Sequence, residues 1–184
     1  YAPHGFTIVV NFGRRIMETT QSDPCNDGIV GIINDSIKRN PCNALKQLLD
    51  ENPEVAVALN SLDDNVNLPI ETGHLVKKNV QDNTKIAIPA NASILDPNRI
   101  RMLVGQNIIG AFHTHVNTNP TNDGTGLMFS DSDINYLYNV TSNSAFENIN
   151  FDDFFLTLTV KKHNANNEIG TYAIKIKDPL KFRN

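Results

Sequence analysis

The sequence predicts an α/β (α+β) domain in which helices flank a central mixed β-sheet. Segments with helical spacing occur early in the chain and again after its middle, and apolar runs of strand length lie between and after them. The chain has 184 residues, which is enough for one well-buried core. We find no internal repeat and no low-complexity linker, so these segments belong to one continuous fold.

The N-terminal third is predicted to form a strand followed by helices. Residues 6–12 (FTIVVNF) are rich in β-branched and aromatic side chains, which favours a strand. Isoleucines recur every four residues at 27–39, which predicts a helix. A second helical segment covers 44–62, with Asn43 as its candidate cap and Pro53 as the residue that kinks or divides it.

The character of the chain changes after a polar loop at 63–67. The remaining predicted elements, in chain order, are strands at 68–79 and 84–90, a short helix at 96–105, a buried strand at 106–115, a loop at 116–126, a helix at 130–142, and a closing hairpin of strands 153–163 and 168–178 around the turn 164–167.

Composition excludes two classes of function. The formal net charge is −4 and the pI is about 5.7, with no basic stripe of the kind that neutralises phosphates, so nucleic acid is not an expected partner. The longest apolar runs, such as 108–112 and 154–160, are far shorter than the ~20 residues that span a bilayer. We therefore expect no membrane span.

The two cysteines, Cys25 and Cys42, each follow a proline. We predict a disulfide between them, which implies an oxidising compartment and an exported protein; two unrelated free thiols are the alternative. The chain begins at Tyr1, so we also expect it to be part of a larger polypeptide.

A candidate metal site lies at the end of the buried strand. His113 and His115 are separated by one residue, so their imidazoles project from the same face of the strand and can bind one ion. Ser130 is a suitable N-cap for the next helix, and Asp133 falls in the first turn of that helix, from which its carboxylate can reach the same ion. Asp131 is the substitute ligand if Asp133 faces outward.

Two imidazoles and one carboxylate leave the fourth position of a tetrahedral zinc ion open to water, which is typical of a catalytic site. Such a site needs a carboxylate to accept the proton of that water and pass it to a leaving amine. Glu71 is our candidate, because it lies in a strand-like run and precedes Gly73, a residue that lets another backbone segment or a ligand approach closely. The upstream alternatives Glu18, Glu51 and Glu54 fall in polar or helical stretches.

These residues resemble the JAMM motif of the JAB/MPN+ zinc metalloproteases: a glutamate in E-x-G, then H-T-H, then S-x-x-D at a helix start. The resemblance covers roughly residues 43–177. It implies a JAB/MPN-like fold, with His113, His115 and Asp133 as zinc ligands, Glu71 as general acid/base and Ser130 as the hydrogen-bond donor to the oxyanion. It also implies hydrolysis of peptide or isopeptide bonds, often to ubiquitin-like proteins.

The sequence departs from the family at two points near the site. Val116 stands where the family has a proline after the second histidine, and the gap from His115 to Ser130 is about twice the family's usual length. The N-terminal stretch is a third departure. We therefore divide the chain into a segment of unknown role, 1–42, and a metallohydrolase domain, 43–184.

Three other interpretations stay open. A JAB-like module can serve as a scaffold without catalysis. The abundance of asparagine, the start at Tyr1 and the predicted disulfide together suggest an exported piece of a larger bacterial protein, of which a C-terminal toxin or effector domain is one version. H-x-H also occurs in cupins and in barrel amidohydrolases, but the expected cupin glutamate is missing and the barrel needs a longer chain.

His4, His74 and His163 are not expected in the site. Candidate substrates are ubiquitin conjugates, other proteins and peptidoglycan peptides.

Overall fold

The structure is a computed structural model that describes residues 6–12, 41–92, 95–116, 128–143, 154–161, 168–176 and 182, with backbone alone at 6–12, 41 and 42. In chain order, the elements are β1 (Phe6–Phe12), α1 (Pro41–Glu51), α2 (Pro53–Asn65), β2 (Gly73–Lys78), β3 (Lys85–Pro89), β4 (Ile108–Thr114), α3 (Asp131–Ser142), β5 (Phe155–Lys161) and β6 (Ile169–Ile176).

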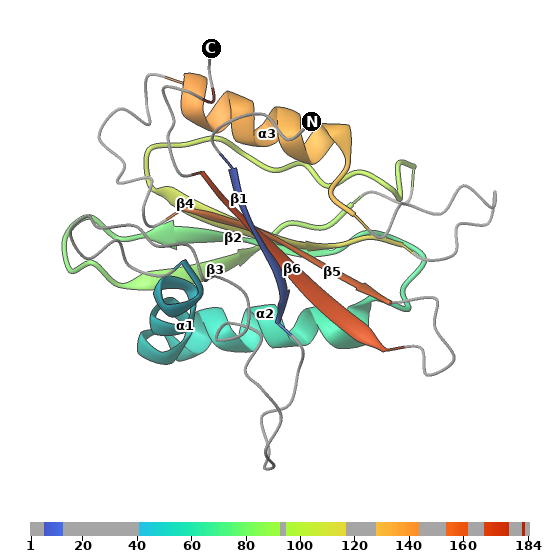
Figure 1. Cartoon of the computed structure of the whole chain (residues 1–184), viewed down its shortest axis with the longest axis horizontal. Coiled ribbons are helices and arrows are strands. Elements are labelled where there is room, and N and C mark those ends of the chain that lie inside the picture. The colour runs from blue at the N-terminus through green and yellow to red at the C-terminus, as the bar shows by residue number, and fades with distance from the viewer. Residues whose placement is uncertain are drawn as a thin grey trace, which may run out of the picture.

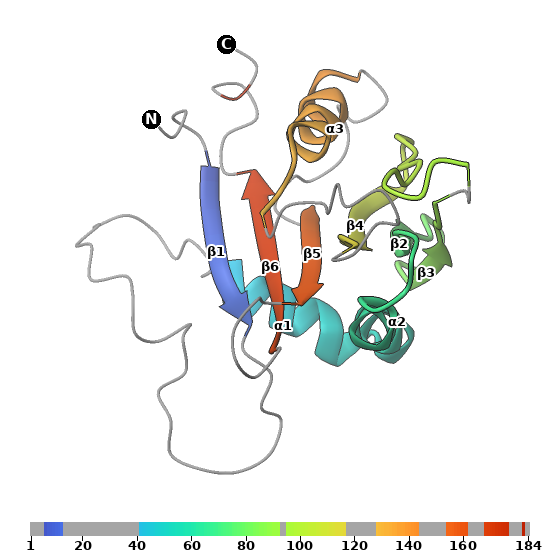
Figure 2. The same ribbon diagram turned by 90° about the vertical axis from the view of Figure 1, so that its right-hand side faces the viewer.

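These strands form one mixed six-stranded sheet in the order β1-β6-β5-β4-β2-β3. β4 and β5 are parallel, and the other neighbours are antiparallel. α3 covers one face of the sheet, and α1 and α2 cover the other (Figures 1 and 2). The coarse prediction of an α+β fold with a mixed sheet between helices is therefore confirmed, as is the strand at 6–12.

A hydrophobic core lies on each face of the sheet. On one face, Leu137 and Val140 of α3 pack with Leu156 of β5 and other buried residues. On the opposite face, apolar residues of α1 and α2 pack against the neighbouring side chains of the same strands, including Phe112 of β4. Because successive side chains of a strand point to opposite faces, β4 is buried along its whole length.

Pro53 separates the two N-terminal helices, as predicted, because a proline has no N–H to continue a helix but is tolerated in its first turn. The predicted cap at Asn43 is wrong, since α1 already begins at Pro41. The polar loop expected at 63–67 begins later, because α2 continues to Asn65.

The short helix predicted at 96–105 is also wrong. Instead, this stretch lies beside the residues that lead into β2. The Glu71 N–H donates to the Pro97 carbonyl at 2.7 Å, and the Ala92 N–H donates to the Glu71 carbonyl at 2.9 Å. The Pro97 carbonyl, which a helix would pair internally, is thus satisfied by Glu71, so a long-range contact overrides the local preference of this stretch.

The closing hairpin is present as β5 and β6, which pair from Lys161↔Ile169 onward. The described residues contain no helix long and apolar enough to cross a bilayer. β1 pairs with β6, so the strand from the proposed 1–42 segment lies at the edge of the same sheet. The predicted helix at 27–39, the turn 164–167, Cys25, the Cys42 side chain, His4 and His163 lie outside the described residues, as does the loop at 116–126 apart from Val116.

Candidate metal centre

The two histidines lie at the end of β4, where the strand leads toward α3. His113 pairs with Gly73 of β2 on the side of the sheet that faces α3. His115 follows two residues later and donates its N–H to the Thr159 carbonyl of β5 at 3.3 Å. The side chains are almost completely buried, with 1% of His113 and 2% of His115 exposed. The predicted convergence of these two imidazoles is therefore present.

The third side chain comes from the first turn of α3. Ser130 caps this helix, and its hydroxyl oxygen accepts a hydrogen bond from the Asp133 N–H at 3.3 Å. The Asp133 carboxylate accepts in turn from the Ser130 N–H at 2.7 Å, which completes a capping box. This local arrangement turns Asp133 toward the histidines rather than toward solvent. Asp131, the substitute ligand, is exposed.

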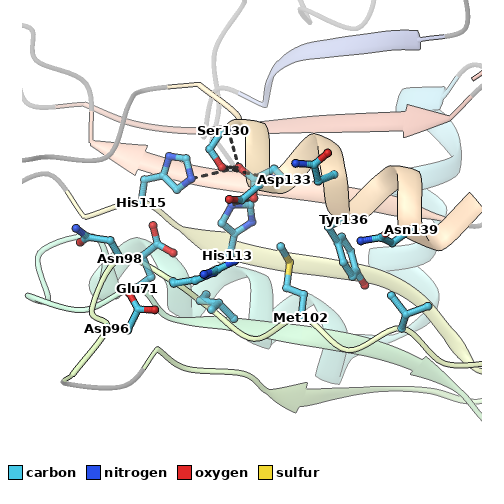
Figure 3. A pocket seen from close by; sticks show the side chains of 15 residues that line it. Glu71, Asp96, Asn98, Met102, His113, His115, Ser130, Asp133, Tyr136 and Asn139 are labelled. Atoms are coloured by element: carbon cyan, nitrogen blue, oxygen red, sulfur yellow. Dashed lines mark hydrogen bonds and ion pairs between the residues drawn. The ribbon is translucent and has the colours of Figure 1, made fainter.

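Asp133 lies within ion-pair distance of both rings. His113 Nε2 is 3.1 Å from Asp133 Oδ1, and His115 Nε2 is 3.4 Å from Asp133 Oδ2. One potential ligand atom from each of the three residues lies within 4.8 Å of the others. Figure 3 shows the three side chains directed toward a common point, with Ser130 above them. His113 lies in β4, His115 directly follows it and Asp133 lies in α3, so the fold sets the geometry of the three side chains.

The hydrogen bonding of these residues fits a bound cation. Among the described residues, the buried Nδ1 of His113 has no hydrogen-bond partner. The buried Nε2 lies 3.1 Å from Asp133 Oδ1. Leaving a buried polar atom unsatisfied costs ~1–3 kcal/mol, and a metal ion would satisfy Nε2 in the ring form that carries no proton there. Burial alone would raise the pKa of Asp133, but hydrogen bonds to His113 and His115 hold that pKa well below its usual range. Asp133 is therefore a carboxylate at neutral pH, and this triad could bind a metal ion.

Glu71 lies just before β2 and is buried, with 4% of the residue exposed. Burial raises its pKa to about 8, with a further rise from the negative charge of Asp133, while His115 and the Ile100 backbone amide oppose the rise. It lines the same cleft as the triad, and Figure 3 shows its carboxyl group directed toward His115. The structure thus brings all five predicted site residues together.

Ser130 is bonded to Asp133 in this structure. Its Oγ donates to Asp133 Oδ2 at 2.8 Å while accepting from the Asp133 N–H. Ser130 also lines the cleft, so its hydroxyl is near any group that reaches the triad. Its observed role is to cap α3 and to orient Asp133.

The cleft extends from the triad along α3 and has a volume of about 570 Å³. One wall is the polar side of α3, and the other is the 96–104 stretch, which replaces the predicted helix. The Tyr136 hydroxyl joins the walls by donating to the Leu103 carbonyl at 3.2 Å. The lining residues that the sequence did not indicate are Asp96, Asn98, Arg99, Ile100, Met102, Val104, Ser132, Asn135, Tyr136 and Asn139.

No motif marks that second wall in the sequence, because long-range hydrogen bonds hold it at the site, from the Glu71 N–H to the Pro97 carbonyl and from the Tyr136 hydroxyl to the Leu103 carbonyl. His74, in contrast, lies on the other face of the sheet, since it pairs with Phe112. Burial lowers the pKa of His74, and its side chain does not line the cleft.

The chain matches no protein-family model, no curated protein and no solved structure. The fold and the geometry of the site are therefore the basis for a functional assignment.

Proposed function

We propose that this protein is a zinc-dependent peptidase or isopeptidase. The observation that carries the proposal is the convergence of a buried His113, His115 and Asp133 with a buried Glu71 at the end of an open cleft. A purely structural role would not need an acidic side chain with a raised pKa beside three potential metal ligands.

His113, His115 and Asp133 would hold the ion, because two imidazoles and one carboxylate are a common catalytic set for zinc. When bound there, zinc supplies Lewis acidity, which polarises a carbonyl group and makes a water molecule acidic near neutral pH. The three-residue ligand set leaves space on the cleft side for a substrate.

Glu71 would act as the general acid/base. Its pKa of about 8 lies near neutrality, where a group both accepts and releases protons readily. The positive charge of a bound ion would lower this pKa and favour the carboxylate, the form that accepts a proton from water. The protonated carboxyl group can then donate to the leaving amine, so one residue serves both halves of the reaction.

Ser130 would donate its hydroxyl hydrogen to the carbonyl oxygen as negative charge develops there. This hydrogen now points to Asp133 Oδ2, and a hydroxyl rotates easily. The backbone N–H of Ser130 would still hold Asp133 after that rotation.

The side chains that line the cleft support a polypeptide substrate. Asn135 and Asn139 of α3 offer amide groups that can bond to a peptide backbone, and Met102 and Val104 offer apolar surface on the other wall. Proteins, ubiquitin-like conjugates and peptidoglycan peptides all contain amide bonds that such a site can hydrolyse.

Glu71→Gln tests this function, with Glu54→Gln as the matched control because Glu54 is exposed in the first turn of α2. Zinc-loaded proteins would be assayed on a protein mixture by labelling new N-termini, on ubiquitin dimers, and on peptidoglycan stem peptides. We expect wild type and Glu54→Gln to cleave at least one class. Glu71→Gln should retain zinc and lose ~10²–10⁴-fold in kcat.

Two results would contradict the proposal. Zinc-loaded wild type that cleaves none of these substrates would exclude the assigned chemistry. Equal cleavage by wild type and Glu71→Gln would remove Glu71 from the reaction and favour a binding module.

A further inference from the structure

Thr114 lies between the two histidines, but its side chain belongs to the opposite face of the sheet. His113 pairs with Gly73 on the side of α3, so the alternation of the strand directs Thr114 toward the side of α1 and α2. Thr114 is buried, with 1% exposed. It cannot contact a substrate in the cleft, and the chemistry proposed above gives it no role.

Thr114 is joined to Thr72, the residue that follows Glu71. The Thr114 N–H donates to the Thr72 carbonyl at 2.8 Å. The Thr72 N–H donates to the Thr114 side-chain Oγ1 at 3.0 Å. The two hydroxyl oxygens are 3.3 Å apart, and Thr114 Oγ1 is also 3.3 Å from the Thr72 carbonyl oxygen. A set of short contacts therefore links the segment that carries Glu71, just before β2, to the segment that carries both histidines, at the end of β4.

One of these bonds departs from the usual antiparallel ladder. In a hydrogen-bonded pair, two residues exchange both backbone N–H to carbonyl bonds. Here the Thr72 N–H is donated to a hydroxyl instead. Beyond this pair the two segments bond to other parts of the protein. The His115 N–H donates to the Thr159 carbonyl of β5, and the Glu71 N–H donates to the Pro97 carbonyl. The Thr114 hydroxyl thus completes the pairing of Thr72 with Thr114, the last bonded pair before the two segments separate beside the cleft.

We propose that Thr114 is a positioning residue whose hydroxyl fixes Glu71 relative to His113 and His115. This inference rests on the proposed function, because the position of Glu71 relative to the histidines matters only if Glu71 transfers protons there. Displacing a catalytic group by ~1 Å can cost ~10²-fold in rate. The hydrogen bond from the Thr72 N–H to Thr114 Oγ1 joins the residue next to Glu71 to the residue between the two histidines. It is therefore well placed to prevent such a shift.

Thr114→Val tests the proposal because it removes the hydroxyl and keeps the shape of the side chain. Thr114→Ser restores a hydroxyl. Thr157→Val is the matched control, since Thr157 is a fully buried threonine of β5 whose Oγ1 has no hydrogen-bond partner within the described part of the chain. If Thr114→Val does not fold, Thr114→Ala replaces it, because alanine also lacks the hydroxyl and adds no bulk.

The first readout is turnover of the zinc-loaded protein. We expect Thr114→Val to lower kcat ~10- to 100-fold, with KM within about twofold and zinc affinity within about threefold of wild type. Thr114→Ser and Thr157→Val should keep kcat within about threefold. A Thr114→Val enzyme with wild-type kcat would overturn the proposal. So would a parallel loss of zinc affinity, because Thr114 would then support the metal ligands rather than Glu71.

Two further readouts need no turnover and therefore separate this proposal from the proposed function. The amide of Thr72 should exchange with solvent about tenfold faster in Thr114→Val than in wild type or Thr114→Ser, as measured by NMR. In Co²⁺-loaded protein, Thr114→Val should shift the visible absorption band in the same direction as Glu71→Gln. Unchanged exchange or an unchanged band would overturn the inference even if the wild type is active. If the wild type is inactive, the same two results still decide whether Thr114 positions Glu71.

Discussion

Glu71 and Asp133 are both buried carboxyl groups, yet their surroundings shift their pKa values in opposite directions. Burial dominates at Glu71 and raises its pKa to about 8. At Asp133 the effect of burial is exceeded by hydrogen bonds to His113 and His115, and the pKa falls. Paired carboxyl groups with separated pKa values are typical of acid–base sites, because one group stays ionised while the other exchanges protons.

The raised pKa of Glu71 predicts how the stability of the metal-free protein depends on pH. The folded protein retains the Glu71 proton up to about pH 8, whereas the unfolded chain loses it near the ordinary value of 4.5. Between these pH values the unfolded state binds fewer protons at this residue. The free energy of unfolding should therefore fall as pH rises through this window, by at most ~1.4 kcal/mol per pH unit from this group.

Glu71→Gln removes this contribution, so the difference between the two proteins isolates it. Urea unfolding of chelator-treated wild type and Glu71→Gln at several pH values from 5 to 9 would measure it. We expect the variant to gain stability relative to wild type as pH rises. Parallel pH profiles for the two proteins would show that burial does not raise the Glu71 pKa.

The sequence allowed four of the five site residues to be placed by local rules. The alternation of a strand puts His113 and His115 on one side, and the capping preference puts Ser130 and Asp133 in a helix start. Glu71 was chosen by its strand-like context and by resemblance. Its companions Asp96 and Asn98 were missed, because they reach the site through a turn held by long-range backbone bonds.

At the scale of elements, the close contact between β2 and β4 depends on Gly73. A Cβ atom at this position would collide with the Phe112 carbonyl oxygen and would lie 3.0 Å from Ile100 Cδ1. The first atom belongs to the backbone and cannot move aside without shifting β4. Gly73 therefore permits the packing that brings Glu71 close to the histidines.

Gly73→Ala should destabilise the protein by ~1–3 kcal/mol, because the added methyl group overpacks a backbone contact. Gly105→Ala is the matched control, since a Cβ there meets its nearest atom at an ordinary 3.7 Å. It should leave stability within about 0.5 kcal/mol of wild type. Chemical unfolding of both variants measures these differences, and equal stability of the two would contradict the proposed close packing.

Elements with strong local signals were predictable and those without them were not. Pro53 marks the break between α1 and α2, and Ser130 marks the start of α3. The stretch 96–105 is predicted to be a short helix after a turn, but in the structure it is bonded to the backbone of Glu71. The pattern within one segment does not encode such a partner, because the two bonded residues are distant in the sequence.

At the scale of the whole molecule, the site lies where β4 ends and α3 begins. α3 connects the parallel strands β4 and β5 across one face of the sheet, and the carboxyl end of a strand in such a unit is a common position for ligands. The cores on both faces bury β4 completely, and helices cover both faces of the sheet (Figure 1).

The order of strands and the pairing of β4 with both β2 and β5 bring together residues that are far apart in the sequence. The sequence predicted the six strands, the helices that correspond to α1, α2 and α3, and the coarse α+β class. It did not predict the order of strands in the sheet, because order depends on which edges meet during folding rather than on the pattern within any one strand.

The most direct test of the account is the zinc content of the purified protein after loading and removal of free metal, measured by elemental analysis. We predict about one zinc ion per chain in wild type and in Glu71→Gln, and far less in His115→Ala and Asp133→Asn that remain folded. Bound zinc should also raise the thermal stability of the first two proteins alone. A folded wild type that takes up no zinc, or that binds it equally well without His115 and Asp133, would contradict the account.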